Sequence, residues 1–130
     1  MNDINNRSEE EQLEEIVFSI VAYAGECRGL AFEALELSEN GDVDSANARL
    51  KEADKALYQA HHVQTDLIQR EAAGERFPVS MIFVHAQDHL MTAISEKELI
   101  KKLVKGNARI DDLTRRLEKV EEIVKAGRGI

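Results

Sequence analysis

Two histidines with a neighbouring aspartate are the residues whose types and spacing best suit chemistry. His85 and His89 lie four positions apart, so their rings share one face of a helix, and Asp88 borders that face. The surrounding segment, residues 84–91, is otherwise largely apolar. Ionisable groups are costly to bury in such surroundings unless they are paired, and unpaired ones often have a role in binding or catalysis. We therefore predict that this segment is the working site of the protein.

Three kinds of chemistry fit this spacing. The first is structural, a core histidine that is hydrogen-bonded to a carboxylate. The second is a zinc site, for which two histidines and an aspartate supply ligands, although the Glu that follows the first His in zinc proteases is absent. The third is nucleophilic: a neutral imidazole attacks phosphorus and forms a phosphohistidine, while Gln87 or His89 stabilises the phosphoryl oxygens. The spacing alone leaves all three open.

The elements that position these residues are predicted to be helices. Many Ala, Leu, Glu and Lys residues and a single proline favour helix over sheet. Ser8 and Glu11 have the spacing of a capping box, which begins a first helix, and Asn40-Gly41 ends it. Asp42 is a suitable N-cap for a second helix.

Glycines and a proline mark further features of the chain. Gly25 and Gly29 lie inside the apolar repeat of the first helix, where we expect them to weaken it and to let a neighbouring helix approach closely. The second helix is expected to fade near residues 72–74. Pro78 closes the linker, and a third helix is expected to begin near Val79.

Apolar residues surround the predicted third helix instead of forming one stripe. They are Met81, Ile82, Phe83, Val84, Leu90, Met91, Ala93 and Ile94. A helix that is apolar on all sides must be buried on all sides, which a lone three-helix domain of this size hardly achieves. Self-association, with this helix near the symmetry axis, is the simplest solution. The alternative is that its own C-terminal continuation covers it.

A heptad repeat follows a predicted break in the helical pattern at residues 105–107. Its apolar positions are Ile110, Leu113, Leu117, Val120 and Val124. We expect this segment either to add a short helical bundle to an oligomer or to fold back on the third helix. Residues 127–130 are expected to be disordered.

The composition of the chain narrows the class of protein. Its 130 residues fit one domain, and a net charge of −8 argues against nucleic acid as the main partner. No apolar run is long enough for a membrane span, and the N-terminus lacks the pattern of a secretory signal. The single cysteine, Cys27, excludes a disulfide framework and is interpreted as a small packing residue. We expect a soluble cytoplasmic protein.

Three blocks of sequence resemble the lactose/cellobiose class of enzyme IIA, the phosphocarriers of the bacterial sugar phosphotransferase system. The blocks are EEIVFSIVAYAGECRGLAFEALELSENGD (residues 14–42), AHHVQTDLIQREAAGE (residues 60–75) and VHAQDHLMT (residues 84–92). The resemblance covers residues 13–103 in the order and spacing of the family. The last block favours the cellobiose and N,N'-diacetylchitobiose branch over the lactose branch.

The resemblance implies an all-α fold, an antiparallel three-helix bundle that assembles as a homotrimer. It implies that His85 accepts a phosphoryl group from the phosphocarrier HPr and passes it to a cysteine of a sugar-specific IIB component. It also implies that Gln87 and His89 shape the phosphate pocket. Asp88 would meet its copies on the symmetry axis around one divalent metal ion per trimer, and magnesium suits such oxygen ligands.

We accordingly divide the chain into a flexible N-terminus (residues 1–10), a IIA-like helical domain (residues 11–105) and a C-terminal helical extension (residues 106–130). The extension lies beyond the family resemblance and is interpreted as a lineage-specific addition, a trimer-stabilising helix or an engineered fusion. We hypothesise that it reinforces self-association. The rival function is a non-catalytic helical oligomer or an engineered scaffold with a vestigial IIA site. His61 is interpreted as structural or pocket-lining, and His62 as exposed.

Overall fold

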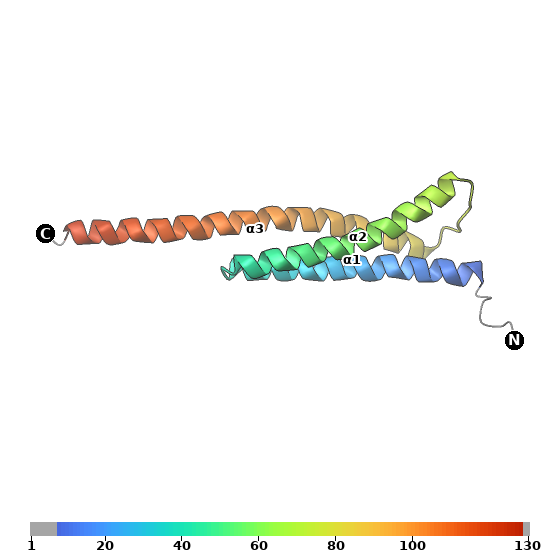
Figure 1. The fold of residues 1–130 in the computed structure, drawn as a ribbon, viewed down its shortest axis with the longest axis horizontal. Helices are drawn as coiled ribbons and strands as arrows, with labels where there is room; N and C mark the ends of the chain where they lie inside the picture. Colours follow the sequence, from blue (N-terminus) through green and yellow to red (C-terminus); the bar gives the residue numbers. More distant parts are fainter. Residues whose placement is uncertain (1–7, 129–130) are drawn as a thin grey trace.

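A computed structural model describes residues 8–128, and these form three helices and no strand. They are α1 (Glu9–Glu39), α2 (Val43–Ala72) and α3 (Met81–Arg128). The helices run up, down and up, and α3 continues well past the turn that joins α1 and α2 (Figure 1). The predicted all-α, antiparallel three-helix fold is thereby confirmed. Residues 1–7 of the predicted flexible N-terminus and residues 129–130 of the predicted disordered end lie outside the described residues. Both predictions are wrong for the neighbouring described residues, because α1 already includes residues 9–10 and α3 continues through residues 127–128.

The first two helices begin and end near the predicted residues because local groups cap them. Ser8 Oγ accepts a hydrogen bond from Glu11 N at 3.2 Å, and Asp42 Oδ1 accepts one from Ser45 N at 3.2 Å. Gly41 follows α1 with a φ of +83°, a conformation that glycine adopts without steric cost. The α1–α2 turn is therefore specified by its own residues.

α1 is the central helix of the bundle. It packs against α2 and α3 more extensively than these two pack against each other. Its buried face consists mainly of small side chains, which let both neighbours come close; they include Ala24, Cys27, Ala31, Ala34 and Ser38. Larger apolar side chains of the other helices fill the core, among them Leu50, Leu57, Leu67, Leu90 and Ile100. Complete burial of one such side chain contributes about 2 kcal/mol to stability.

Gly25 and Gly29 do not act as predicted. α1 is unbroken across both positions, and both glycines are exposed. A Cβ atom built at either one would meet no neighbouring element within 4 Å. The close approach of the helices therefore occurs on the alanine-rich side of α1, and the glycine side faces solvent.

A partly buried cluster of charges joins α2 to α3. Lys97 is buried, and its Nζ lies 2.8 Å from Asp54 Oδ1. Lys101 Nζ lies 2.8 Å from the same oxygen atom. Burial by itself lowers the pKa of the Lys97 ammonium, but hydrogen bonds to Asp54 and a neighbouring glutamate outweigh it and raise this pKa above its ordinary value. Burial opposes ionisation of Asp54 too, yet hydrogen bonds from both lysines lower its pKa. Lys97 and Asp54 are thus held in their charged forms.

α3 is one unbroken helix of 48 residues, so the predicted break at residues 105–107 is wrong. Gly106 lies where the helix is still held by the α1–α2 turn. Asn107 Nδ2 donates a hydrogen bond to Ser38 Oγ at 2.9 Å, and a Cβ atom built on Gly41 would lie 3.4 Å from Asp111 Oδ2. Beyond this point α3 runs on without folding back, so that alternative is wrong as well (Figure 1).

Candidate functional site

The predicted site segment, residues 84–91, lies in the first turns of α3. The helix begins at Met81, slightly after the expected Val79, because Ser80 Oγ accepts a hydrogen bond from Phe83 N at 3.2 Å. Leu90 is fully buried against the core and so fixes the rotation of the helix about its axis. This rotation decides which side each polar residue of the segment occupies.

The structure brings His85 and His89 together as predicted. Their ring centroids lie 4.5 Å apart, and the rings meet edge to face at 80°. His85 is exposed, whereas His89 is half-buried, and its Nδ1 is buried without a hydrogen-bond partner in the described part of the chain. The interpretation as a core histidine paired with a carboxylate therefore does not hold. Buried polar atoms are usually paired, so an unpaired one is typical of a site that another molecule completes.

Gln87 does not lie beside His85 within one chain. Residues two apart occupy different sides of a helix, and Gln87 Oε1 accepts a hydrogen bond from Gln64 Nε2 of α2 at 2.5 Å. Both glutamines line a small cavity of about 50 Å³ between the helices. Gln64 was not predicted as a partner of Gln87. The sequence did offer a signal, because Gln64 is a polar residue among the apolar positions of α2 that face the core.

Asp88 is exposed on a third side of α3. Within residues 8–128, no three His, Cys, Asp or Glu side chains are grouped so that they could hold a metal ion. The zinc interpretation of His85, Asp88 and His89 within one chain is therefore wrong.

Asp88 belongs to a row of exposed side chains that follows α3 at three- and four-residue intervals, which we call the α3 seam. Over the bundle its members are Met81, Val84, Asp88, Met91, Ser95, Leu99 and Leu103. The buried residues of α3 lie on the opposite side of the helix and include Ala86, Leu90, Ala93, Ile100 and Val104.

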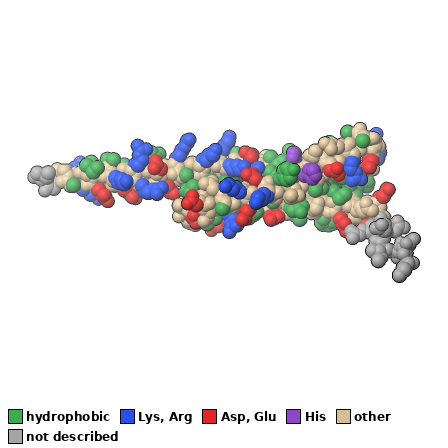
Figure 2. Space-filling model, in the orientation of Figure 1, with side chains coloured by type: hydrophobic (Ala, Val, Ile, Leu, Met, Phe, Trp, Pro, Cys, Tyr) green, Lys and Arg blue, Asp and Glu red, His purple; other side chains and the backbone are tan. Residues whose placement is uncertain are grey.

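No residue of the described range 8–128 covers the α3 seam. Met81 is 85% exposed and Leu99 is 62% exposed, and hydrophobic side chains show at the surface in Figure 2. α3 is thus apolar on opposite sides, as predicted, and only one side packs on α1 and α2. The alternative that the C-terminal continuation covers the other side is wrong, since that continuation runs away from it.

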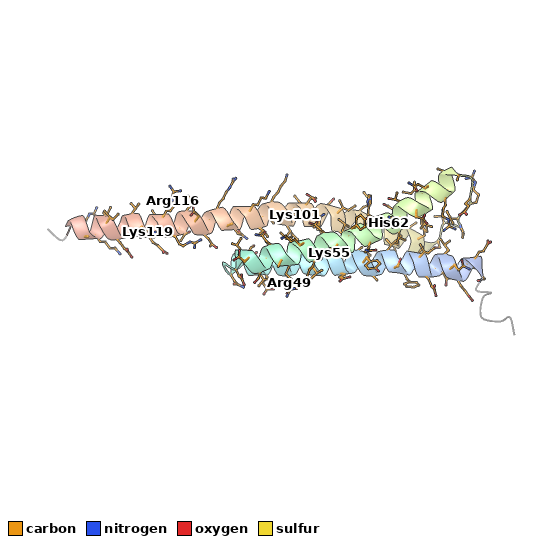
Figure 3. All side chains as sticks on the ribbon, in the orientation of Figure 1. Arg49, Lys55, His62, Lys101, Arg116 and Lys119 are labelled. Carbon is orange, nitrogen blue, oxygen red and sulfur yellow. The ribbon has the colours of Figure 1, made fainter. Side chains whose placement is uncertain are left out.

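The remaining residues considered in the sequence lie on α1 and α2. His61 and His62 are both exposed, and Figure 3 labels His62 on α2. The His62 ring stacks on Tyr58 with a centroid separation of 6.1 Å. His61 lines a depression together with Lys97, and this depression includes neither His85 nor His89. Cys27 is buried, and burial raises the pKa of its thiol, which agrees with a packing role.

The fold and the site define a small three-helix protein with an accessible histidine pair near one end of its bundle. The family model of the "PTS system, Lactose/Cellobiose specific IIA subunit" matches residues 15–107. The chain belongs to this family of phosphotransferase-system components. None of the described helices is long and apolar enough to cross a membrane.

Individual relatives agree with this assignment. The lactose-specific EIIA component of Lactococcus lactis subsp. lactis is 44% identical over 94 residues, which make up 72% of this chain and 90% of that protein. The crystal structure of the cellobiose-specific enzyme IIA from Bacillus anthracis has a TM-score of 0.75 and 36% identity, covering 82% of this chain and 95% of that one. The IIA(Chitobiose) in a solution structure of the Escherichia coli IIA(Chitobiose)–HPr complex has a TM-score of 0.66 and 37% identity, covering 76% of this chain and 96% of that one.

The family match ends inside α3. We call residues 81–107, which it includes, proximal α3, and residues 108–128 distal α3.

Proposed function

We propose that this protein is a cytoplasmic phosphocarrier of a bacterial sugar phosphotransferase system. In this proposal His85 accepts a phosphoryl group from HPr and passes it to a IIB component, for cellobiose/chitobiose or lactose uptake. The observation that carries the proposal is the exposed His85 ring, which meets the half-buried His89 edge to face. The solved complex of a related IIA protein with HPr supports the identity of the donor.

The proposed chemistry needs an accessible, oriented imidazole and little else from the protein. A ring nitrogen of His85 attacks the phosphorus of the donor's phosphohistidine, and the new N–P bond forms as the donor's N–P bond breaks. In the second step a thiolate of the IIB component attacks the same phosphorus, and the imidazole of His85 leaves. Both steps require that another protein reaches the ring, and the exposure of His85 allows this.

His89 and Gln87 are proposed to shape the phosphate pocket in different ways. His89 is in ring contact with His85 and limits its rotation. Gln87 lies on the other side of the α3 seam from His85, so it cannot serve the ring of its own chain. In a cyclic assembly around the seam, Gln87 of one copy would approach His85 of the next.

The proposed assembly is a homotrimer with the α3 seam at its axis. An exposed apolar row of this length is typical of a surface that another molecule covers. Within that row Asp88 is the one charged residue, and three copies of it would repel each other unless a cation with oxygen ligands neutralised them. We propose one divalent ion per trimer, magnesium by preference, with a structural role.

Metal analysis of purified variants tests this axial site. Asp88→Asn is expected to lose the bound ion, while His85→Ala and His89→Ala keep it. The proposal is wrong if the histidine variants lose metal and Asp88→Asn retains it.

The test of the function is phosphoryl acceptance from phosphorylated HPr. The wild-type chain is expected to gain one phosphoryl group that is labile in acid and stable in base. His85→Ala is expected to gain none, and His61→Ala, which alters an exposed histidine on α2, is expected to behave as wild type. Equal uptake by His85→Ala would overturn the assignment.

The rival proposal is a helical oligomer or scaffold whose IIA site is vestigial. It predicts normal assembly of the wild-type chain with no phosphate uptake. The exposure of His85 favours the carrier, because a vestigial site has no need of an open imidazole.

A further inference from the structure

Distal α3 presents an apolar row against which no other described part of the chain packs. Every residue from Asp112 to Arg128 is exposed, although five of the side chains among them are large and apolar. Leu117, for example, is 57% exposed in the middle of this segment. Exposed rows of this kind mark surfaces for association, because they are unfavourable in water.

The apolar row of distal α3 continues the α3 seam without a change of side. After Leu103 the seam residues are Gly106, Ile110, Leu113, Leu117, Val120 and Val124. Their spacing alternates between three and four residues, which is the pattern of a coiled-coil core. Since Gly106 does not interrupt the helix, one straight row runs from proximal to distal α3.

We infer that distal α3 is a self-association element that packs in parallel against distal α3 of other copies of this chain. The parallel direction rests on the assembly proposed above, in which copies share the seam of proximal α3. The hydrogen bond from Asn107 to Ser38 joins α3 to α1 just before distal α3 begins. This contact fixes the direction in which distal α3 extends from the bundle.

The charges beside the row agree with a parallel arrangement. In heptad notation Ile110 and Leu117 occupy core position a, and Leu113 and Val120 occupy core position d. Arg116 then lies at flanking position g and Glu121, five residues later, at the next flanking position e. In a parallel coiled coil these two positions of neighbouring helices lie side by side, so opposite charges attract. Figure 3 shows Arg116 on distal α3, beyond the ends of α1 and α2.

Other occupants fit less well. Basic and acidic residues alternate along distal α3 in nearly equal number, so it lacks the basic face that an anionic membrane surface selects. Its apolar row is also narrow, as in a coiled-coil seam, and charged side chains surround it in Figure 2.

Cysteine cross-linking of the full chain tests both the contact and its direction. Val120→Cys places a thiol in the row, and Arg115→Cys places one on the opposite side of the same helix. The native Cys27 is buried and stays out of the reaction. Mild oxidation is expected to join Val120→Cys chains to each other and to leave Arg115→Cys chains separate. Equal cross-linking of both variants, or of neither, would overturn the inference.

A charge placed in the row gives a second readout. Leu117→Glu is expected to lower the melting temperature by at least about 4 °C, while Ala126→Glu, on the far side of the helix, leaves it unchanged. If Leu117→Glu and Ala126→Glu had the same melting temperature, no copy of the chain would cover the row in the purified protein. That result would contradict self-association through distal α3.

Phosphate uptake from HPr separates this inference from the proposed function. Normal uptake without Val120→Cys cross-linking contradicts only the self-association of distal α3. Cross-linking without uptake contradicts only the carrier role of His85.

Discussion

Proximal α3 packs one apolar side on α1 and α2 and leaves the α3 seam exposed, whereas distal α3 has only the seam. Both belong to one continuous helix, yet their stability has different origins. Proximal α3 is held by burial within its own chain, whereas the described residues offer distal α3 no such packing, from which most helical stability in proteins comes. In our proposals the chemistry lies on the part that packs in the bundle, and the part beyond the family match forms contacts between molecules.

The strongest contrast between the two parts is expected from leucine truncation. Leu90→Ala removes a fully buried side chain and should lower the free energy of unfolding by about 3 kcal/mol. Leu117→Ala makes the same chemical change in distal α3 and should cost less than about 1 kcal/mol in dilute protein. Urea unfolding at low protein concentration measures both, and equal losses would contradict the division of α3 into two parts.

The charge cluster between α2 and proximal α3 should give the next largest effect. Asp54→Asn removes one of the carboxylates that pair with the buried Lys97 and should cost about 2 kcal/mol at neutral pH. Because folding lowers the pKa of Asp54, its contribution is present at neutral pH and is lost as the pH falls through that lowered pKa. Wild type and variant should therefore converge in acid. The double variant Asp54→Asn/Lys97→Met is the control and should recover most of the loss, because it removes the buried ammonium together with its Asp54 partner.

A smaller loss is expected at the root of distal α3. Asn107→Ala removes the hydrogen bond to the buried Ser38 and should cost about 1 kcal/mol. Amide exchange should also rise in distal α3 more than in proximal α3. Uniform exchange changes along the whole helix would show that this contact does not fix the junction.

The smallest effect, and a gain, is expected at the junction itself. Gly106 lies inside a continuous helix with open space around it, so Gly106→Ala should raise the free energy of unfolding by about 0.5 to 1 kcal/mol. Thermal unfolding of both proteins checks this. A loss of stability would indicate that the helix bends or breaks at Gly106, as the sequence pattern first indicated.

The sequence predicted the elements and the histidine pair because both depend on local spacing. Ser8 and Asp42 cap their helices through residues three positions on, and His85 meets His89 one turn later. The side of α3 that carries each polar residue depends on how the helix is rotated against the core. For that reason the contact of Gln87 with Gln64 was not predicted.

Several of the wrong predictions concern glycines. Gly106 was interpreted as a helix break, but the contacts on either side of it outweigh its weak helix propensity. Gly25 and Gly29 were interpreted as points of close approach, yet the packing of α1 turns them toward solvent. A glycine in a helical pattern does not by itself reveal which side of the helix is buried.

The most direct test of the carrier role is to incubate the full chain with phosphorylated HPr and to map the modified residue by mass spectrometry under basic conditions. The account predicts a single phosphoryl group on His85 and none on His61, His62 or His89. Phosphate on another histidine would contradict it. So would a chain that stays unmodified under conditions in which a control IIA protein is fully phosphorylated.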